Sequence, residues 1–497
     1  MNTQVQQQKA RIGLLVPLLG FGLFLLLYVS LVLAVISTVG EMPLNQGGSV
    51  TEINMVSDRK FWVTDYGADE IWYVDVDNNS YVTYQGLKGP DDARSDGRGN
   101  AWWINSDDNT LGQLMLDTAT ITTWPLPVDG SPSGTAIGSN DQIWVSDSLD
   151  SHIYRFDISS SELCTYTVPT YEGGDFLLFS QERLWLGDSL NEQLLKVNPN
   201  AGEYTTWSLA SGAQPQGLAM DDQNNLWWID PSLNFLGRLN ATNNSITTYD
   251  IPTTAIALNS PNDPNQEAIS AGIYGVSSPE SNTEPFHVTH RDGAIWFTDW
   301  SGGRVGFLDP STASGSTTTI TPTHGTVPSR QCQTVEPLST SMATTSSGTI
   351  QWTDNIYDVV KDSDGWLIYQ LPGSGSPWGI AADAGNVWFT DQGRQVVGRF
   401  ELISCFELTL EKTGSGARPV SDPVSSSGCP TSSYTEGQVI YLLANPSAGW
   451  TVDQWTGTDD DVASTTNNFV TMPGNEHSVA VHYVEGNFQY LPMVTNR

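Results

Sequence analysis

A carboxylate recurs at one fixed place in this 497-residue chain, directly after short stretches centred on tryptophan. Among the carboxylates at this position are Asp65, Asp147, Asp188, Asp299, Asp354 and Asp391. If the strands that end in them lie side by side, the carboxylates meet at one rim and could hold a ligand there. A repeated Asp at a strand end is explained more simply by hydrogen bonds to the amides of the following turn. We therefore expect these residues to be structural.

Other chemical motifs are missing from the sequence. It has no Gly-x-Ser-x-Gly elbow, no P-loop and no His-Glu-x-x-His motif, and its six His residues show no paired spacing. The four cysteines Cys164, Cys332, Cys405 and Cys429 are widely separated, which gives little support to a zinc site. Outside the cytoplasm they could form one or two disulfides. Cys405 with Cys429 is the first pair to test, because both lie in or near the C-terminal unit.

The tryptophan stretches belong to an internal repeat. The Trp residues of the first four copies are spaced 41 residues apart, and four less regular copies follow. The eight copies contain Trp62, Trp102-Trp103, Trp144, Trp185, Trp227-Trp228, Trp296, Trp352 and Trp388. Each copy alternates β-branched and aromatic residues with polar ones over four short strands, which is typical of one propeller blade. We therefore predict an all-β fold, a β-propeller of seven or eight blades over residues 50–403, with eight favoured.

Two insertions interrupt the repeat, over residues 253–285 and about 323–347. Insertions of this length are usually functional or disordered. The last copy leaves the pattern after Leu402. We therefore expect its fourth strand to be absent or to be supplied by the N-terminal segment Val50–Met55.

A hydrophobic segment over residues 12–39 has no charged residue and is long enough to cross a bilayer core of about 30 Å. Lys9 and Arg11 precede it, which places residues 1–11 in the cytoplasm. A cleavable signal peptide has a shorter apolar region and a small-residue cleavage site, and neither is evident. The sequence predicts a single-pass signal anchor, a linker over 40–49 and an ectodomain outside the cytoplasm. Cleavage of the anchor would make the protein secreted.

The formal net charge is -35, with 20 Lys and Arg against 55 Asp and Glu. Nucleic-acid binding needs clustered cations, so a nucleic-acid partner is not expected. The acidity fits a soluble surface that is exposed to salt.

Residues 404–484 depart from the repeat and predict a second, small β domain, followed by a tail over 485–497. This region contains Gly414-Ser415-Gly416, Gly449-Trp450 and Trp455-Thr456-Gly457. In the placement of these residues it resembles the divergent internalin B-type repeat of bacterial surface proteins. The resemblance implies an accessory or adhesive module.

The propeller repeat resembles the streptogramin (virginiamycin B) lyase family. The stretches that carry the resemblance are Pro377-Trp378-Gly379-Ile380, Trp388-Phe389-Thr390-Asp391 and Gly398-Arg399, and the resemblance extends over residues 50–403. It implies the propeller architecture. It is weaker evidence for the activity, because one repeat type can carry unrelated functions.

The resemblance also implies a chemistry, in which Mg²⁺ held by carboxylates polarises an ester carbonyl while a His removes the alpha proton. Glu284 occupies the position of the family's first metal-binding carboxylate. At the position of the second, this chain has Asp299. Phe286 falls where the His belongs, and His287 is displaced by one residue. On a strand this shift turns the side chain to the opposite face unless a bulge intervenes. His290 is the second candidate base.

Two functions from different classes follow. The first is a membrane-anchored recognition or scaffold module at the cell surface, which binds an envelope glycan, peptide or protein and has no assigned cofactor. The alternative is a lyase that resembles the streptogramin-inactivating enzymes, with Mg²⁺ on Glu284 and Asp299 and with His287 or His290 as the base. A third, weaker alternative is a purely structural envelope protein.

Overall fold

The computed structural model describes residues 39–44, 48–127, 130–149, 151–252, 257–258, 283–327, 330–355, 358–361, 365–373, 375–401, 405–426 and 432–486. The chain divides between Glu401 and Leu402 into two compact units. Every regular element in the described residues is a β-strand. Among these residues no helix is long and apolar enough to cross a membrane. Most of the expected anchor, residues 12–38, lies outside the described residues.

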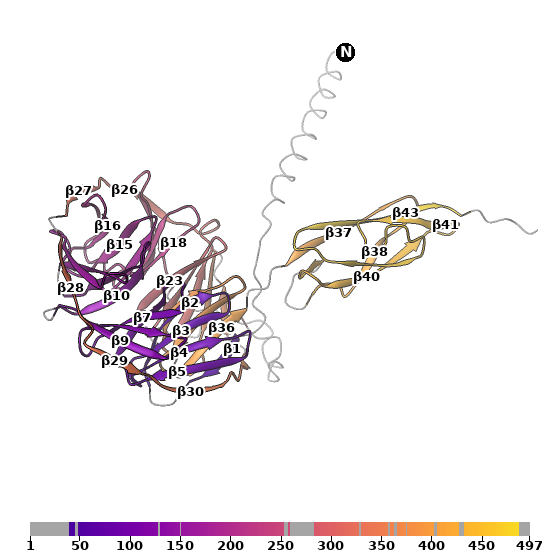
Figure 1. The fold of residues 1–497 in the computed structure, drawn as a ribbon. Helices are drawn as coiled ribbons and strands as arrows, with labels where there is room; N and C mark the ends of the chain where they lie inside the picture. The colour runs from indigo at the N-terminus through magenta and orange to yellow at the C-terminus, as the bar shows by residue number, and fades with distance from the viewer. Residues whose placement is uncertain are drawn as a thin grey trace, which may run out of the picture. The chain divides into compact units, whose positions relative to one another are not determined.

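The first unit is a β-propeller, and its blades 1 to 5 are consecutive antiparallel meanders of four strands (Figure 1). Blades 1 and 2 contain β2 (Val50–Ser57), β3 (Lys60–Asp65), β4 (Glu70–Asp75), β5 (Ser80–Gln85), β6 (Pro90–Ser95), β7 (Asn100–Asn105), β8 (Thr110–Met115) and β9 (Thr120–Pro125). Blades 3 and 4 contain β10 (Pro132–Ile137), β11 (Gln142–Asp147), β12 (His152–Asp157), β13 (Glu162–Thr167), β14 (Leu177–Ser180), β15 (Arg183–Asp188), β16 (Gln193–Asn198) and β17 (Glu203–Ser208). Blade 5 contains β18 (Gln216–Met220), β19 (Leu226–Asp230), β20 (Phe235–Asn240) and β21 (Ser245–Asp250).

Blades 6 and 7 are assembled from distant segments. Blade 6 joins β23 (Pro285–Arg291), β24 (Ala294–Asp299) and β25 (Arg304–Leu308) to β33 (Trp366–Gln370), β32 (Asp358–Lys361) and β22 (Ala257–Leu258). Blade 7 contains β34 (Pro377–Ala382), β35 (Asn386–Asp391) and β36 (Val396–Glu401), and its fourth strand is β1 (Val39–Pro43). The N-terminal segment therefore closes the ring. The closing strand is Val39–Pro43, where the sequence placed the end of the anchor and a linker, whereas Val50–Ser57 is the innermost strand of blade 1.

The described residues of this unit form seven sheets, so the favoured count of eight blades is wrong. The Trp352 copy is the one that forms no blade. Its strand β31 (Thr353–Asn355) pairs with β1 at the outer edge of blade 7. The Trp residues of the other seven copies are buried in blade cores, as large aromatic residues favour, whereas Trp352 is only half-buried.

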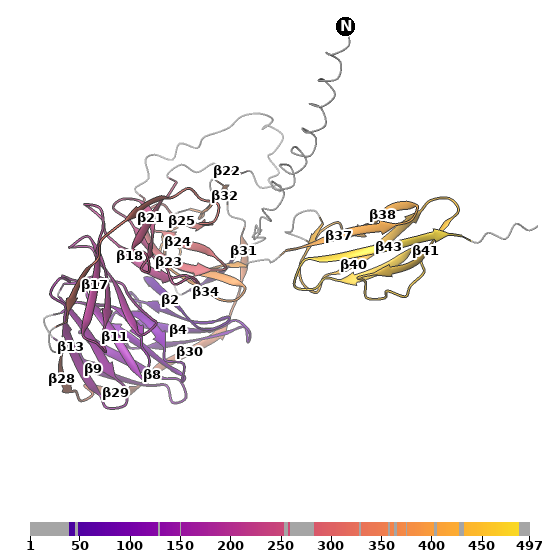
Figure 2. The same cartoon turned by 90° about the horizontal axis from the view of Figure 1, so that it is seen from above.

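An insertion within blade 6, between β25 and β32, forms a belt around the propeller, which we define as residues 316–355. From blade 5 back to blade 1, and then on blade 7, it adds one outer antiparallel strand to each sheet. These strands are β26 (Ser316–Thr319), β27 (Thr323–Thr326), β28 (Gln331–Thr334), β29 (Ser339–Met342), β30 (Thr344–Thr349) and β31. Figures 1 and 2 show the labelled belt strands along the outer edge of the blades. The belt therefore covers the blade edges in the reverse of their chain order.

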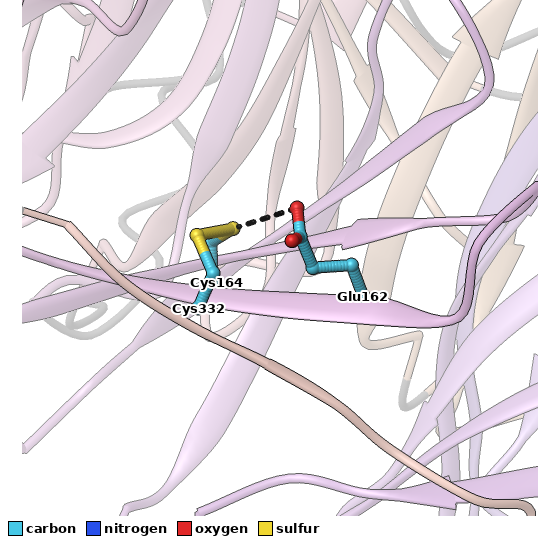
Figure 3. Close-up of side chains that lie close together, drawn as sticks. All are labelled: Glu162, Cys164 and Cys332. Atoms are coloured by element: carbon cyan, nitrogen blue, oxygen red, sulfur yellow. Dashed lines mark hydrogen bonds between the residues drawn. A yellow bond between two sulfur atoms is a disulfide. The ribbon is translucent and has the colours of Figure 1, made fainter.

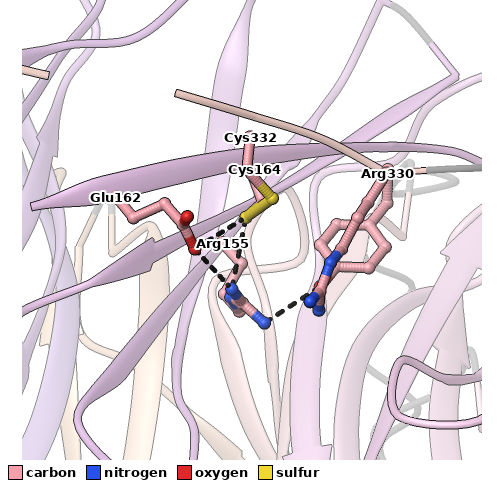
Figure 4. The surroundings of a disulfide bond; sticks show 6 residues. Arg155, Glu162, Cys164, Arg330 and Cys332 are labelled. Carbon is pink, nitrogen blue, oxygen red and sulfur yellow. Dashed lines mark hydrogen bonds and ion pairs between the residues drawn. A yellow bond between two sulfur atoms is a disulfide. The ribbon is translucent and has the colours of Figure 1, made fainter. Parts of the chain in front are cut away.

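A disulfide between Cys164 and Cys332 fastens the belt to blade 3. The two residues are direct partners on the neighbouring strands β13 and β28. Beside them Arg155 donates to Glu162 (3.3 Å; Figure 4). Arg155 also donates to the Tyr166 hydroxyl (3.1 Å). Cys405 is also disulfide-bonded, and its expected partner Cys429 lies outside the described residues, so that pairing stays a prediction.

The second unit is a two-layer β-sandwich. One sheet contains β39 (Ser433–Tyr434), β37 (Phe406–Thr413), β43 (His477–Glu485) and β41 (Trp450–Thr456), and the other contains β38 (Gly416–Asp422), β40 (Val439–Pro446) and β42 (Asn467–Thr471). Buried side chains of both sheets form its core, among them Tyr434, Ile440 and Trp455. This agrees with the small β domain that the sequence predicts.

Candidate functional site

A cavity of about 540 Å³ lies in the centre of the propeller. Residues from the innermost strands of all seven blades, or directly before them, line it. Each of these strands except β14 shows a shift in register near its start, which marks a β-bulge. Bulges change the direction of side chains and are common next to active sites. They allow successive residues of one strand to face the same cavity.

The bulge in β23 decides where His287 points. The register shifts between Pro285 and Val288, and both Phe286 and His287 line the cavity. The sequence predicts that His287 points to the opposite face of the strand unless a bulge intervenes, and the structure has such a bulge. Gly217 makes room for it, because a Cβ at this residue would lie 2.8 Å from the carbonyl oxygen of Phe286. Its φ of 45° also favours glycine.

Both ring nitrogens of His287 have an oxygen within hydrogen-bonding distance. Nε2 lies 2.9 Å from Oε1 of Glu52, and Nδ1 lies 3.0 Å from the carbonyl oxygen of Trp378. The backbone amide of His287 donates to Oγ1 of Thr298 (3.2 Å). The residue is buried, and the three partners come from blades 1, 7 and 6. His287 is thus fixed between blades, with an oxygen atom beside each ring nitrogen.

Aromatic rings form one wall of the cavity. The ring centres of Phe286 and Trp378 are 4.2 Å apart, and Phe176 packs edge-on against both Phe286 (5.5 Å) and His287 (4.8 Å). The indole Nε1 of Trp378 donates to Oε1 of Glu52 (3.2 Å). The wall is therefore an apolar surface with a carboxylate at its border.

Two further carboxylates, Asp92 and Asp91, differ in their surroundings. Asp92 accepts hydrogen bonds from Asn54 (3.0 Å), from Arg94 (3.2 Å) and from the hydroxyl of Thr135 (2.8 Å). For Asp91, burial raises the pKa well above its usual value, and the negative charges of Glu52 and Asp92 raise it further. Asp92 is thus fixed by several hydrogen-bond donors, whereas ionised Asp91 is destabilised by its surroundings.

His290 also lines the cavity, further along β23. Its Nδ1 lies 3.9 Å from Oδ1 of Asp222, which is too far for a hydrogen bond. Its Nε2 is buried and has no hydrogen-bond partner within the described ranges. A ligand in the cavity could satisfy this nitrogen.

Glu284 and Asp299, the expected metal ligands, do not line this cavity. Asp299 is fully buried, and its Oδ1 accepts from the amides of Glu284 (3.0 Å) and Gly302 (2.9 Å). Its Oδ2 accepts from Nε of Arg304 (2.8 Å) and also from Nη2 of that residue. The side chain of Glu284 is exposed and accepts from Ser301. The four donors occupy the lone pairs of Asp299, so this arrangement does not fit Mg²⁺ unless Arg304 moves away.

The recurrent Asp residues behave in the same way. Asp147 accepts from the amides of Ser131 (3.1 Å) and Leu149 (3.0 Å), and Asp391 accepts from those of Ser376 (2.8 Å) and Arg394 (3.1 Å). These bonds confirm that the repeated Asp caps turn amides.

One further group of acidic and sulfur-containing residues lies close together in the described chain, namely Glu162, Cys164 and Cys332. Figure 3 shows the two sulfur atoms joined to each other beside the carboxylate. A cysteine binds a metal as a free thiolate, and both of these cysteines are oxidised. The group is therefore a disulfide with a neighbouring carboxylate, and it does not fit a metal site.

Comparison with known proteins supports the architecture. Residues 37–260 match the virginiamycin B lyase family. Residues 423–487 match the divergent InlB B-repeat domain. Both resemblances expected from the sequence are confirmed, although the first match ends before Glu284. No curated protein sequence matches the chain.

Solved structures of the virginiamycin B lyase type share the propeller fold. A catalytically inactive virginiamycin B lyase from Staphylococcus aureus with quinupristin is 18% identical, covers 73% of this chain and 99% of its own, and gives a TM-score of 0.53. A streptogramin B lyase structure is 20% identical, covers 73% and 96%, and gives 0.51. At this identity the likeness establishes the fold.

Sequence reasoning missed Glu52, Asp91 and Trp378, because each lies in a different blade from His287. A positional signal was present. Glu52 and His287 both lie two residues after the first residue of an innermost strand, so equivalent positions of the repeat face one cavity. A comparison of copies at that position would have brought them together.

Proposed function

We propose that this protein is a recognition module displayed outside the cytoplasm on an N-terminal membrane anchor, and that the central cavity of its propeller binds an envelope glycan, peptide or protein segment. One observation carries the proposal. His287, a candidate base, is held by Glu52 and by the Trp378 carbonyl, while aromatic side chains line the cavity beside it. Aromatic walls with a few polar groups are typical of binding pockets.

Calorimetric titration of envelope glycan and peptide fragments into the ectodomain tests the proposal. Trp378→Ala and Phe286→Ala should each weaken binding at least about tenfold, since large aromatic residues are frequent hot spots. Tyr66→Ala is the matched control, because this aromatic residue is exposed and does not line the cavity. Mass spectrometry of the recovered ligand should find it unchanged. Chemical conversion of the ligand would refute a binding-only role.

The bulge in β23 and the free Nε2 of His290 favour a second candidate, a lyase that opens a cyclic depsipeptide ester. His290 or a released His287 would then remove the alpha proton, and a metal on Glu284 and Asp299 would have to displace Arg304. Incubation of a cyclic depsipeptide with the ectodomain and Mg²⁺ checks this alternative. Ring opening that EDTA abolishes, and that His287→Ala or His290→Ala cripples, would support it. An intact ring under the same conditions would exclude that substrate.

A further inference from the structure

The three-stranded sheet of the C-terminal sandwich is apolar on both faces. Along β40 the side chains alternate, so that Ile440, Leu442 and Ala444 are buried in the core while the residues between them point outward. The outward residues include Val439 (38% exposed), Tyr441 (64%) and Leu443 (50%). Alternation normally places polar residues on the solvent face of a sheet. This face is therefore exceptional.

The neighbouring strands extend the apolar face. Val420 on β38 is the direct partner of Leu443, and Phe469 on β42 is the direct partner of Tyr441. Directly paired residues point to the same side of a sheet, with their Cβ atoms about 5 Å apart. We call Val420, Val439, Tyr441, Leu443 and Phe469 the apolar patch.

The other sheet of the sandwich has the ordinary pattern. On β37 its exposed positions are Glu407, Thr409, Glu411, Lys412 and Thr413. On β43 they are Ser478, Val484 and Glu485, so that Val484 is the one large apolar residue exposed on the described strands of this sheet. The contrast lies within one domain, so a general tolerance for exposed apolar residues does not explain the patch. A contiguous apolar surface of this kind marks an interaction site.

The charge around the patch selects the kind of partner. Asp422 is the direct partner of Tyr441, and Asp459 bonds the Thr471 backbone amide (3.1 Å), next to Val439. Both Asp residues are exposed. Residues 405–486 contain ten Asp and Glu against Lys412 and Arg418. Two copies of this face, or an anionic lipid surface, would bring like charges together, which disfavours both.

We propose that the apolar patch docks a segment of another protein whose aliphatic or aromatic side chains alternate with, or are flanked by, Lys or Arg. The apolar side chains would cover Tyr441, Leu443 and Phe469, and the cations would pair with Asp422 and Asp459. This proposal is independent of the propeller cavity.

A fluorescent nine-residue peptide of alternating Lys and Leu is the probe, titrated into the full chain in zwitterionic lipid nanodiscs with empty nanodiscs subtracted. The wild-type chain should bind it, and the Tyr441→Thr/Phe469→Thr double variant should bind at least about tenfold more weakly. Thr keeps the strand propensity at both positions. Val484→Thr is the matched control, because this residue is exposed on the other sheet, and it should bind as wild type does.

Charge reversal at Asp422 gives a second test. It predicts opposite changes for two peptides, a result that an unfolded variant would not give. Asp422→Lys should weaken binding of the Lys/Leu peptide and strengthen binding of the Glu/Leu counterpart. The proposal would be overturned if the double variant bound the Lys/Leu peptide as tightly as the wild type does. It would also be overturned if the wild type bound a Lys/Ser peptide as tightly as the Lys/Leu peptide. A concentration-dependent dimer of the wild type that the double variant loses in sedimentation would overturn it as well, because the occupant would then be a second copy.

Discussion

Nε2 of His287 in blade 6 lies 2.9 Å from Oε1 of Glu52 in blade 1, and Trp378 of blade 7 forms hydrogen bonds with both residues. Three blades that are distant in the chain thus meet in one hydrogen-bonded group at the cavity wall. The group holds an imidazole in place and keeps both of its nitrogens occupied.

Glu52→Ala should make His287 chemically reactive, because removal of the carboxylate exposes Nε2 to the cavity. Diethyl pyrocarbonate modification, mapped by peptide mass spectrometry, measures this reactivity. We expect slow modification of His287 in the wild type and at least about tenfold faster modification in the variant. His324 is exposed on the belt and serves as the internal reference, with an unchanged rate. Equal rates for His287 in both proteins would contradict the restraint.

Asp91→Asn should stabilise the propeller at neutral pH. The pKa of Asp91 is higher in the folded than in the unfolded state, so the folded state binds more protons and the free energy of unfolding falls as pH rises through this range. At pH 7.5 the variant should melt about 2–4 °C higher, and at pH 4 the gain should largely disappear. Asn can keep the bond from the Asp92 amide. Asp117→Asn, an exposed control, should change the melting temperature little at either pH.

Cys164→Ser/Cys332→Ser should weaken the attachment of the belt. The bond closes a long loop, and loss of such a disulfide costs about 2–5 kcal/mol of stability. Chemical denaturation measures this loss. Amide hydrogen exchange should increase most in β28 and its belt neighbours. In the double variant, a reductant should increase amide hydrogen exchange in these strands little further. If the double variant exchanged in these strands as slowly as the wild type, strand pairing alone would hold the belt.

Met42→Ala should destabilise the whole propeller, because Met42 lies on the closing strand β1 and is almost completely buried. A buried Met-to-Ala change costs about 2–5 kcal/mol. Met115→Ala is the matched control, since Met115 is exposed at the end of β8, and it should cost no more than about 0.5 kcal/mol. Comparable losses for the two variants in thermal unfolding would argue against closure by β1.

Repetition and local pairing made the blades predictable. The copies around Trp62, Trp144 and Trp388 each contain neighbouring strands joined by short turns, so the pairing partners are close in the sequence. Burial of the Trp residues and capping by the repeated Asp follow from the same pattern. The amino-acid sequence by itself therefore determines the strand-rich repeat, the C-terminal β domain and the resemblance to the virginiamycin B lyase family.

Tertiary structure decided what depends on distant pairing. No local signal fixes which outer strand β28 or β1 joins, because exposed blade edges offer similar backbone hydrogen bonds. The count of seven blades, the belt and its disulfide follow from those choices. The cavity likewise appears only when the ring closes, since closure brings Glu52, Trp378 and His287 from different blades to one wall.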